Sequence, residues 1–249
     1  MAIRVAVVGA KGRMGQEVCR AIKKDKDLEL VAEIDLSDSL SMAVDGKAEV
    51  IVDFTNATSA LKTAEFAIAN GIHLVIGTTG FDKENLTQIK NSLAKSPTTG
   101  VLVAPNFAIS AVLMMQFAAT AAKYFESAEI IEFHHPEKID APSGTAVRTA
   151  EMMTESRSAA NREPMPDKTS KSIPGARGGK IGDIPVHSVR MSGLVAHQEV
   201  ILGEQGETLT IRHDSLDRSG YMPGVLLACK EVGKHPGLNI GLENYLKLD

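Results

Sequence analysis

Apolar runs alternate with segments of helical periodicity along the first hundred residues. The short apolar runs predict strands at residues 3–9, 28–35, 49–54, 73–79 and 100–104. Between them, apolar side chains recur every three to four residues, which predicts helices at 13–24, 57–70 and 83–94. Gly71 stands where the second of these helices would end. This repeated strand–helix–strand order is typical of a parallel sheet covered by helices on both faces.

The pattern changes after residue 105. A long helix rich in Ala and Met is predicted at 110–124, a strand at 128–135 and another helix from 146 to about 159. Three strands then follow in direct succession, at 186–191, 197–203 and 207–213, and the sequence GEQG predicts a hairpin between the last two. Consecutive strands favour a mixed or antiparallel sheet in a second domain. A final helix is predicted at 221–232 and would fit best against the first domain.

Composition and charge narrow the class of protein. The 249 residues suffice for one large or two modest domains, and a hydrophobic fraction of 43% is ordinary for a globular protein. A net charge of −4 gives no general attraction to nucleic acid or anionic lipid, so neither partner is expected. No signal peptide is recognisable and no apolar run reaches the roughly 20 residues of a membrane span, so we expect a cytoplasmic protein. Cys19 and Cys229 lack metal-ligand spacing and are expected to be free thiols.

A glycine-rich loop, GAKGRMG at 9–15, joins the first strand to the first helix. Its glycines Gly9, Gly12 and Gly15 suit a tight turn, a close approach of the backbone to pyrophosphate, and close packing of helix on strand. The start of the helix offers unpaired N–H groups to phosphate. Asp35 ends the next strand, where a carboxylate that binds ribose is expected. This context predicts a dinucleotide site rather than a plain turn.

The choice between NAD and NADP depends on the charges near this loop. Asp35 favours a free ribose hydroxyl because a carboxylate repels a 2′-phosphate, and Leu36 beside it adds no positive charge. Lys11 and Arg13, however, could hold a phosphate, unless they simply form a solvated basic loop. We therefore expect both NADH and NADPH to be used.

Two further motifs, GTTGF at 77–81 and APNFAIS at 104–110, follow predicted parallel strands. Ligands of open α/β sheets bind at this end of the strands. Their small residues and backbone N–H groups suit close contact with a nicotinamide, although each motif alone could be an ordinary strand-to-helix turn.

The segment EFHHPEKIDAPSGTA, at 132–146, concentrates the reactive side chains. Neighbouring residues of a strand point to opposite faces, so the two histidines do not form a metal site, and no metal is expected. A histidine exchanges protons near neutral pH, a lysine supplies a cation, and Gly144 and Thr145 open a helix that could bind a carboxylate. These features favour reduction of a small carboxylated substrate over a strand end with solvated polar groups.

These motifs, together with VDFT at 52–55, closely resemble the 4-hydroxy-tetrahydrodipicolinate reductase (dihydrodipicolinate reductase) family over essentially the whole chain. The resemblance implies NAD(P)H-dependent reduction of 4-hydroxy-2,3,4,5-tetrahydrodipicolinate to 2,3,4,5-tetrahydrodipicolinate with loss of water, in the diaminopimelate route to lysine. Whether water leaves on the enzyme or before binding stays open. The resemblance also implies a Rossmann-like cofactor domain at 1–105 and 217–249, an α+β domain with a mixed sheet for substrate binding and tetramerisation at 106–216, and a homotetramer.

The resemblance also assigns roles to individual residues. It implies that His134 is the catalytic proton donor and acceptor, that Lys138 is a second proton donor, and that His135, Gly144 and Thr145 bind substrate. It implies that the cofactor is lined by Gly9, Ala10, Lys11, Gly12, Arg13, Met14, Asp35, Gly77, Thr78, Thr79, Ala104, Pro105, Asn106 and Phe107. Many members carry an arginine after the acidic residue, and Leu36 departs from that pattern, so strict use of NADPH is not expected.

Two other functions share parts of this pattern. A different NAD(P)-dependent dehydrogenase of amino-acid metabolism would keep the glycine loop, and a non-catalytic NAD(P)-binding sensor would keep Gly9, Gly12 and Asp35. Neither requires the segment HHPEKIDAPSGT. Residues 160–185, rich in Pro, Gly, Lys and Ser, predict a long mobile loop, of which 160–182 is either a lid or an idle surface loop.

Overall fold

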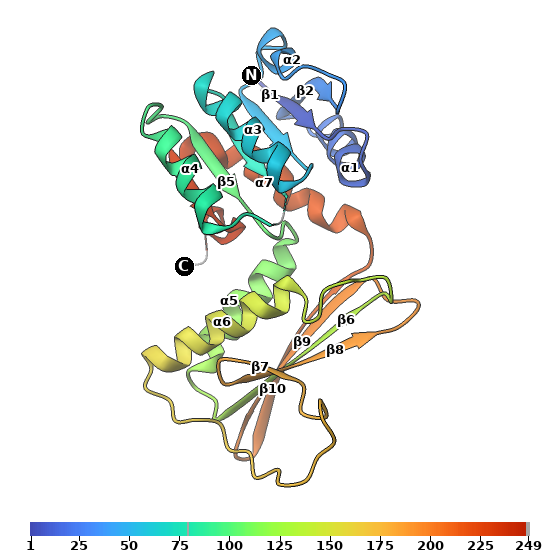
Figure 1. Ribbon diagram of the computed structural model, residues 1–249, viewed down its shortest axis with the longest axis vertical. Coiled ribbons are helices and arrows are strands. Elements are labelled where there is room, and N and C mark those ends of the chain that lie inside the picture. The colour runs from blue at the N-terminus through green and yellow to red at the C-terminus, as the bar shows by residue number, and fades with distance from the viewer. Residues whose placement is uncertain (79, 248–249) are drawn as a thin grey trace. The chain divides into compact units, whose positions relative to one another are not determined.

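The computed structural model describes residues 1–78 and 80–247 (Figure 1). The chain forms two compact units: Met1–Ile109 with Arg218–Asp249, and Ser110–Asp217. The first holds a parallel sheet with helices and the second a mixed sheet, which confirms the predicted fold class. The sequence had placed the boundaries after residues 105 and 216. No helix in the described part of the chain has the length and hydrophobicity needed to span a membrane.

The first unit is built on six parallel strands in the order β11-β5-β4-β3-β1-β2. Their bounds are β1 Ile3–Val8, β2 Leu28–Ile34, β3 Val50–Asp53, β4 His73–Ile76, β5 Gly100–Val103 and β11 Gly237–Ile240. Every residue of β3 and β5 is buried, which explains why these strands consist mainly of apolar residues. The parallel register brings their carboxyl ends to one edge of the sheet.

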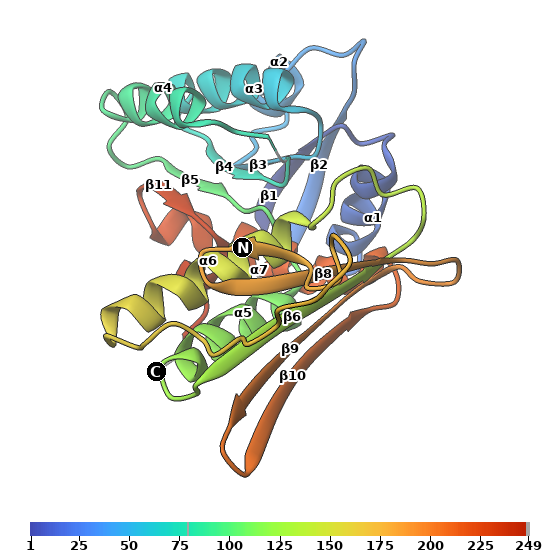
Figure 2. The same cartoon turned by 60° about the horizontal axis from the view of Figure 1, so that its bottom comes forward.

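Helices cover both faces of this sheet (Figure 2). Their bounds are α1 Arg13–Ile22, α2 Ser41–Asp45, α3 Ala57–Ala69, α4 Lys83–Leu93 and α7 Met222–Glu231, with 3₁₀ turns at Arg218–Tyr221, Val232–Lys234 and Leu242–Tyr245. Helices α2, α3 and α4 lie on one face, and α1 and α7 lie on the other. The final helix belongs to the first unit, as expected, where Lys230 forms ion pairs with Asp25 at 2.8 Å and Asp27 at 3.1 Å.

Strand β11 was not predicted. It is only four residues long, pairs with β5 at the edge of the sheet, and none of its residues is fully buried. A short edge strand carries little hydrophobic signal, so its sequence, GLNI, does not stand out. The pairing of β11 extends the sheet with a strand from the far end of the chain.

The second unit contains a five-stranded sheet in the order β10-β9-β6-β8-β7. Strand β6 (Ser127–His134) is its centre, parallel to β8 (Ile184–Arg190) and antiparallel to β9 (Ala196–Glu204), and β9 pairs with β10 (Glu207–Ser215). Helices α5 (Ile109–Ala122) and α6 (Gly144–Ala159) lie side by side (Figure 1). Alternate residues of β6 are buried, and Gln198, on the same face as buried Glu132, donates a hydrogen bond to Thr149 of α6. One face of the sheet therefore packs on helix α6.

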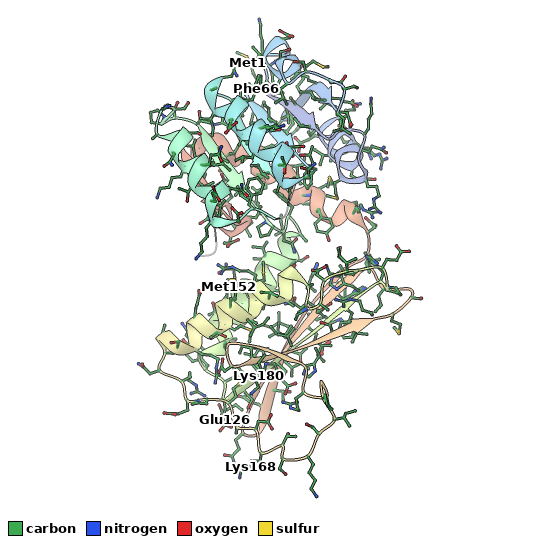
Figure 3. All side chains as sticks on the ribbon, in the orientation of Figure 1. Met1, Phe66, Glu126, Met152, Lys168 and Lys180 are labelled. Carbon is green, nitrogen blue, oxygen red and sulfur yellow. The ribbon has the colours of Figure 1, made fainter. Side chains whose placement is uncertain are left out.

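The segment predicted as an uninterrupted loop at 160–185 contains a strand. Residues Gly179–Ile181 form β7, which pairs antiparallel with β8, and β8 begins two residues earlier than predicted. The preceding residues are tied to the sheet because Arg177 forms ion pairs with Glu129 at 2.5 Å and with Asp167 at 3.3 Å. Figure 3 marks exposed Lys168 within this segment and Lys180 on β7. The lid interpretation stays a prediction.

Candidate active site

The glycine loop in the first unit turns sharply between β1 and α1. The Gly9 N–H donates to Ile34 O at 2.9 Å, and the Gly12 N–H donates to Gly9 O at 3.0 Å. A Cβ on Gly15 would lie 2.0 Å from Gly9 O, so only glycine lets the helix approach the loop this closely. No side chain caps the start of α1 at Gly12, so its first N–H groups are available to an anion.

Asp35 lies beside this loop, directly after β2. Its carboxylate accepts hydrogen bonds from the Leu36 N–H at 2.9 Å and the Lys11 N–H at 2.8 Å. These two bonds lower the pKa of Asp35 below its ordinary value, so the carboxylate is charged at neutral pH. Leu36 is 97% exposed and contributes no charge. The structure thus brings the predicted ribose-binding carboxylate to the glycine loop, with Lys11 and Arg13 exposed nearby in sequence.

A pocket of about 420 Å³ opens beside the glycine loop, a size that suits part of a dinucleotide. Its lining comes from the glycine loop and the ends of β3 and β4: Gly12, Arg13, Met14, Phe54, Thr55, Asn56, Ala57, Gly77 and Thr78. A Cβ on Gly77 would lie 2.1 Å from the Phe54 ring, so glycine is required for this wall of the pocket. The small residues and open helix start fit a pyridine dinucleotide.

Not every predicted cofactor residue lines this pocket. Thr79 lies outside the described residues. Ala104, Pro105, Asn106 and Phe107 follow β5, and the buried Phe107 ring packs 5.7 Å from that of Phe54, between centroids. The sequence did not predict that Phe54 to Ala57 line this pocket, although VDFT ends β3 and parallel strands end at a common edge.

Asp53 connects the ends of β3 and β4 beneath the pocket. Its side chain is fully buried, and Oδ1 accepts from the Thr55 N–H at 2.9 Å, the Thr55 hydroxyl at 2.6 Å and the Thr78 hydroxyl at 3.4 Å. Burial raises the pKa of Asp53, and the threonine hydrogen bonds only partly offset this. Both threonines line the pocket, so Asp53 fixes part of its wall.

In the second unit, the catalytic candidates follow the end of β6. His134 is the last residue of that strand, and its Nδ1 lies 2.5 Å from Glu132 Oε2. Glu132 has no exposed side-chain surface and also accepts two 2.8 Å hydrogen bonds from Arg190 and one of 3.1 Å from the Ser143 N–H. Burial alone would raise the pKa of Glu132, but the hydrogen bonds from His134 and Arg190 outweigh it and bring the pKa to about 2. Glu132 is therefore a buried, charged carboxylate.

Lys138 lies in the loop between β6 and α6. Its Nζ forms an ion pair with Asp140 Oδ1 at 2.6 Å, and its N–H donates to His135 O at 3.2 Å. The side chain of Arg190 reaches the same loop and donates to Asp140 O at 2.7 Å. His135 is exposed, whereas His134 is partly buried, as expected because neighbouring residues at a strand end face different ways. The loop thus carries a lysine cation, paired with Asp140, three residues after the histidine pair.

Helix α6 begins at Gly144, two residues earlier than predicted. Ser143 is its N-cap and accepts from the Ala146 N–H at 3.2 Å. A Cβ on Gly144 would meet nothing within 4 Å, so space is open at this helix start. Gly144 and Thr145 are thus placed where a substrate carboxylate could meet the N-terminus of a 16-residue helix. Among the described residues, no group of three or more His, Cys, Asp or Glu side chains could hold a metal ion.

Two family models match consecutive parts of the chain. Residues 3–107 match "Dihydrodipicolinate reductase, N-terminus", and residues 110–246 match "Dihydrodipicolinate reductase, C-terminus". The chain belongs to the dihydrodipicolinate reductase family. As a member of this family it is an NAD(P)H-dependent oxidoreductase.

Full-length relatives support this assignment. The 4-hydroxy-tetrahydrodipicolinate reductases of Nocardia farcinica and Corynebacterium efficiens are 55% and 54% identical over 248 residues, and each match covers 100% of both chains. A dipicolinate-bound dihydrodipicolinate reductase from Paenisporosarcina sp. TG-14 is 38% identical, with a TM-score of 0.89, and the match covers 99% of this chain and 100% of that one. The alternatives of a different dehydrogenase or a non-catalytic sensor are not favoured.

Within this reductase site, sequence reasoning missed Glu132 and Arg190. Glu132 precedes His134 by two residues, so both point to the same face of β6, and this spacing was a usable signal. Arg190 is the register partner of His134 on β8, which only the strand pairing reveals.

Proposed function

We propose that this protein reduces 4-hydroxy-2,3,4,5-tetrahydrodipicolinate to 2,3,4,5-tetrahydrodipicolinate with NAD(P)H and loss of water, in the diaminopimelate route to lysine. Its 55% identical full-length relative carries this reductase name, and the solved relative is bound to dipicolinate, a small dicarboxylate. The observation that carries the proposal is the loop from His134 to Gly144, which presents a histidine, a lysine and an open helix N-terminus together.

We assign proton transfer to His134. Its Nδ1 is engaged by Glu132, which leaves Nε2 as the ring nitrogen that exchanges a proton with the substrate. We assign His135, Gly144 and Thr145 to substrate binding, because the N–H groups at the start of α6 suit one carboxylate of the substrate. Lys138 supplies a positive charge for a substrate anion and is the second proton donor.

The residues around the glycine loop would hold the dinucleotide, which supplies a hydride when bound. Gly9 to Met14 would contact the pyrophosphate, Asp35 the ribose, and Gly77 to Thr79 with Ala104 to Phe107 the nicotinamide end. Support comes from the pocket between the glycine loop and the ends of β3 and β4.

We further propose that NADH and NADPH are both used. The charged Asp35 favours the free ribose of NADH, whereas Lys11 and Arg13 can accept the 2′-phosphate of NADPH. The ratio of kcat/KM for the two cofactors tests this. A preference beyond about a thousandfold, roughly 4 kcal/mol, would contradict dual use.

The deciding experiment is oxidation of NAD(P)H by the purified protein with enzymatically generated substrate. His134→Gln and Lys138→Ala should each lower kcat/KM by about 10²–10⁴-fold, the usual contribution of acid–base groups. His187→Gln is a matched control, since His187 bonds Glu129 on the same sheet at 2.7 Å. Rates near wild type in both site variants would remove the assigned roles. If Lys138→Arg retained most of the activity, Lys138 would act through its charge alone.

We also propose that the protein is a homotetramer assembled through its second unit. The sheet face opposite α6 carries the half-buried apolar side chains Ile131, Phe133 and Ile201, and β10 is an edge strand with exposed Leu209. Apolar surface of this kind is stabilised by burial against another copy. Sedimentation equilibrium of the purified protein tests the proposal, and a monomer at micromolar concentration would contradict it.

A further inference from the structure

We propose that Glu132 is the positioning residue of this active site: one buried carboxylate that fixes His134, Arg190 and the N-terminus of α6 relative to one another. The inference rests on the proposed reductase function, because it assigns a task to a residue that serves His134 and Lys138. Glu132 itself is buried behind these groups, and its role is to hold them.

The first observation is that each carboxylate oxygen of Glu132 accepts two hydrogen bonds. Oε2 accepts hydrogen bonds from His134 Nδ1 at 2.5 Å and from Arg190 Nη1 at 2.8 Å. Oε1 accepts hydrogen bonds from Arg190 Nη2 at 2.8 Å and from the Ser143 N–H at 3.1 Å. Its side chain is 0% exposed, so water does not compete for these oxygens. Charge-assisted bonds without competing water are about twice as strong as neutral ones, and the bidentate arginine fixes the plane of the carboxylate.

The second observation concerns the tautomer of His134. A charged carboxylate can only accept hydrogen bonds, so the proton of a neutral imidazole must be on Nδ1. Nε2 then carries the lone pair that accepts a proton in one half of the reaction and returns it in the other. The Glu132 carboxylate is thus the partner that selects this tautomer.

The third observation is that the same carboxylate extends to the other site residues. Arg190 bonds Glu132 and the Asp140 carbonyl with one guanidinium, and the Asp140 carboxylate holds Lys138 Nζ at 2.6 Å. Ser143, whose N–H bonds Glu132, caps the helix that begins with Gly144. A displacement of Glu132 would therefore shift the histidine, the lysine tether and the anion-binding turn together.

The chain contains its own control for this arrangement. Glu129, on the opposite face of β6, also bonds a histidine and an arginine: His187 at 2.7 Å and Arg177 at 2.5 Å. Its side chain is 34% exposed, and its contacts lead to β8 and to the segment before β7 rather than to the loop of Lys138. Glu129→Gln thus removes a similar carboxylate from the same strand without touching the proposed site.

The experiment compares Glu132→Gln with Glu129→Gln in the full-length protein. A glutamine amide can donate to His134 Nδ1, so we expect the ¹⁵N NMR signals of His134 to change from the Nδ1–H to the Nε2–H tautomer. We expect kcat to fall by about 10²–10⁴-fold, as when the carboxylate partner of a catalytic histidine is neutralised, while NADH affinity stays within about twofold. Glu129→Gln should keep wild-type kcat within about threefold.

The outcomes separate this inference from the proposed function. A wild-type protein that does not reduce the substrate would refute the function, and the NMR comparison would still test the tautomer. An active wild type, with Glu132→Gln within threefold of its kcat and with an unchanged tautomer, would overturn the inference. An equal loss in Glu129→Gln would overturn it too, because the effect would then be general to the sheet.

Arg190→Lys keeps the inference testable should Glu132→Gln fail to fold. Lysine keeps a positive charge beside Glu132 but cannot bond both carboxylate oxygens and the Asp140 carbonyl in one plane. We expect the Nδ1–H tautomer to persist while kcat falls by about tenfold or more, because the tether to Lys138 is lost. A wild-type kcat in this variant would contradict the proposed extension to Lys138.

Discussion

Replacing Arg157, a buried cation on α6, should strongly destabilise the second unit. Its side chain is 3% exposed, and each of its five N–H donors has an acceptor. Nε donates to Asp183 at 3.0 Å, Nη1 to Ala122 O and Phe125 O, and Nη2 to Glu126 O and Glu163 O. The guanidinium therefore joins the end of α5, the end of α6 and the start of the segment that leads to β7.

The magnitude follows from what the substitution leaves behind. Arg157→Met keeps much of the side-chain volume but leaves four carbonyl groups and the Asp183 carboxylate without this donor. An unsatisfied buried acceptor costs about 1–3 kcal/mol, and removing one partner of a buried ion pair costs about 3–5 kcal/mol. Some of these groups regain water, since Asp183 is 34% exposed. We therefore expect a total loss of about 3–5 kcal/mol, and about 1–3 kcal/mol for Arg157→Lys, which keeps the charge but has three donors.

Urea denaturation followed by far-UV circular dichroism measures this loss, because the chain has no tryptophan to report unfolding by fluorescence. Arg148→Met is the matched control on the same helix: Arg148 is 46% exposed and its ion pair with Glu151 is 3.7 Å long, so the change should stay within about 0.5 kcal/mol. Hydrogen exchange should also accelerate at residues 160–178 in Arg157→Met. A loss below about 1 kcal/mol in Arg157→Met would refute the reasoning.

Two further substitutions test the first unit. Burial raises the pKa of Asp53, so its contribution to stability is full at low pH and is lost as pH rises through the folded-state pKa. As the pH rises from 4 to 8, wild type should therefore lose stability relative to Asp53→Asn, as measured by urea denaturation at each pH. A difference in unfolding free energy between the two proteins that stays constant across this range would contradict the burial argument. Leu36→Arg places a cation beside Asp35 at a 97% exposed position and should raise kcat/KM for NADPH relative to NADH by about tenfold, roughly 1.4 kcal/mol; an unchanged ratio would argue against 2′-phosphate binding there.

The parallel sheet could be predicted because burial on both faces leaves a continuous apolar signal. Strands β3 and β5 are fully buried, and each is preceded by a polar residue, Glu49 or Thr99. Strands β7 and β11 lie at sheet edges, with three and four residues and no fully buried side chain. Edge strands as short as these are defined by pairing with a neighbour rather than by their own hydrophobicity, so local sequence does not reveal them.

The site was predictable where its residues are close in sequence. His134, Lys138 and Gly144 lie within eleven residues, and the end of a strand and the start of a helix could both be inferred there. Arg190 was not predictable, because it meets Glu132 only through the pairing of β6 with β8. Asp53 was missed because its role depends on burial and on two threonines, one of them 25 residues away.

Strand β6 shows why residue types alone do not identify the site. Glu129 and Glu132 each bond one histidine and one arginine, so the two clusters share the same chemical groups. They differ in solvent exposure: the charges around Glu129 are partly screened by water, whereas Glu132 is shielded and must be fully paired to stay charged. A fully paired, shielded carboxylate orients its partners more strictly, because any rotation of His134 removes a donor from Glu132 that water does not replace. The strand's alternation places one cluster against helix α6 and the other on the opposite face, and that difference in environment separates a positioning carboxylate from a structural one.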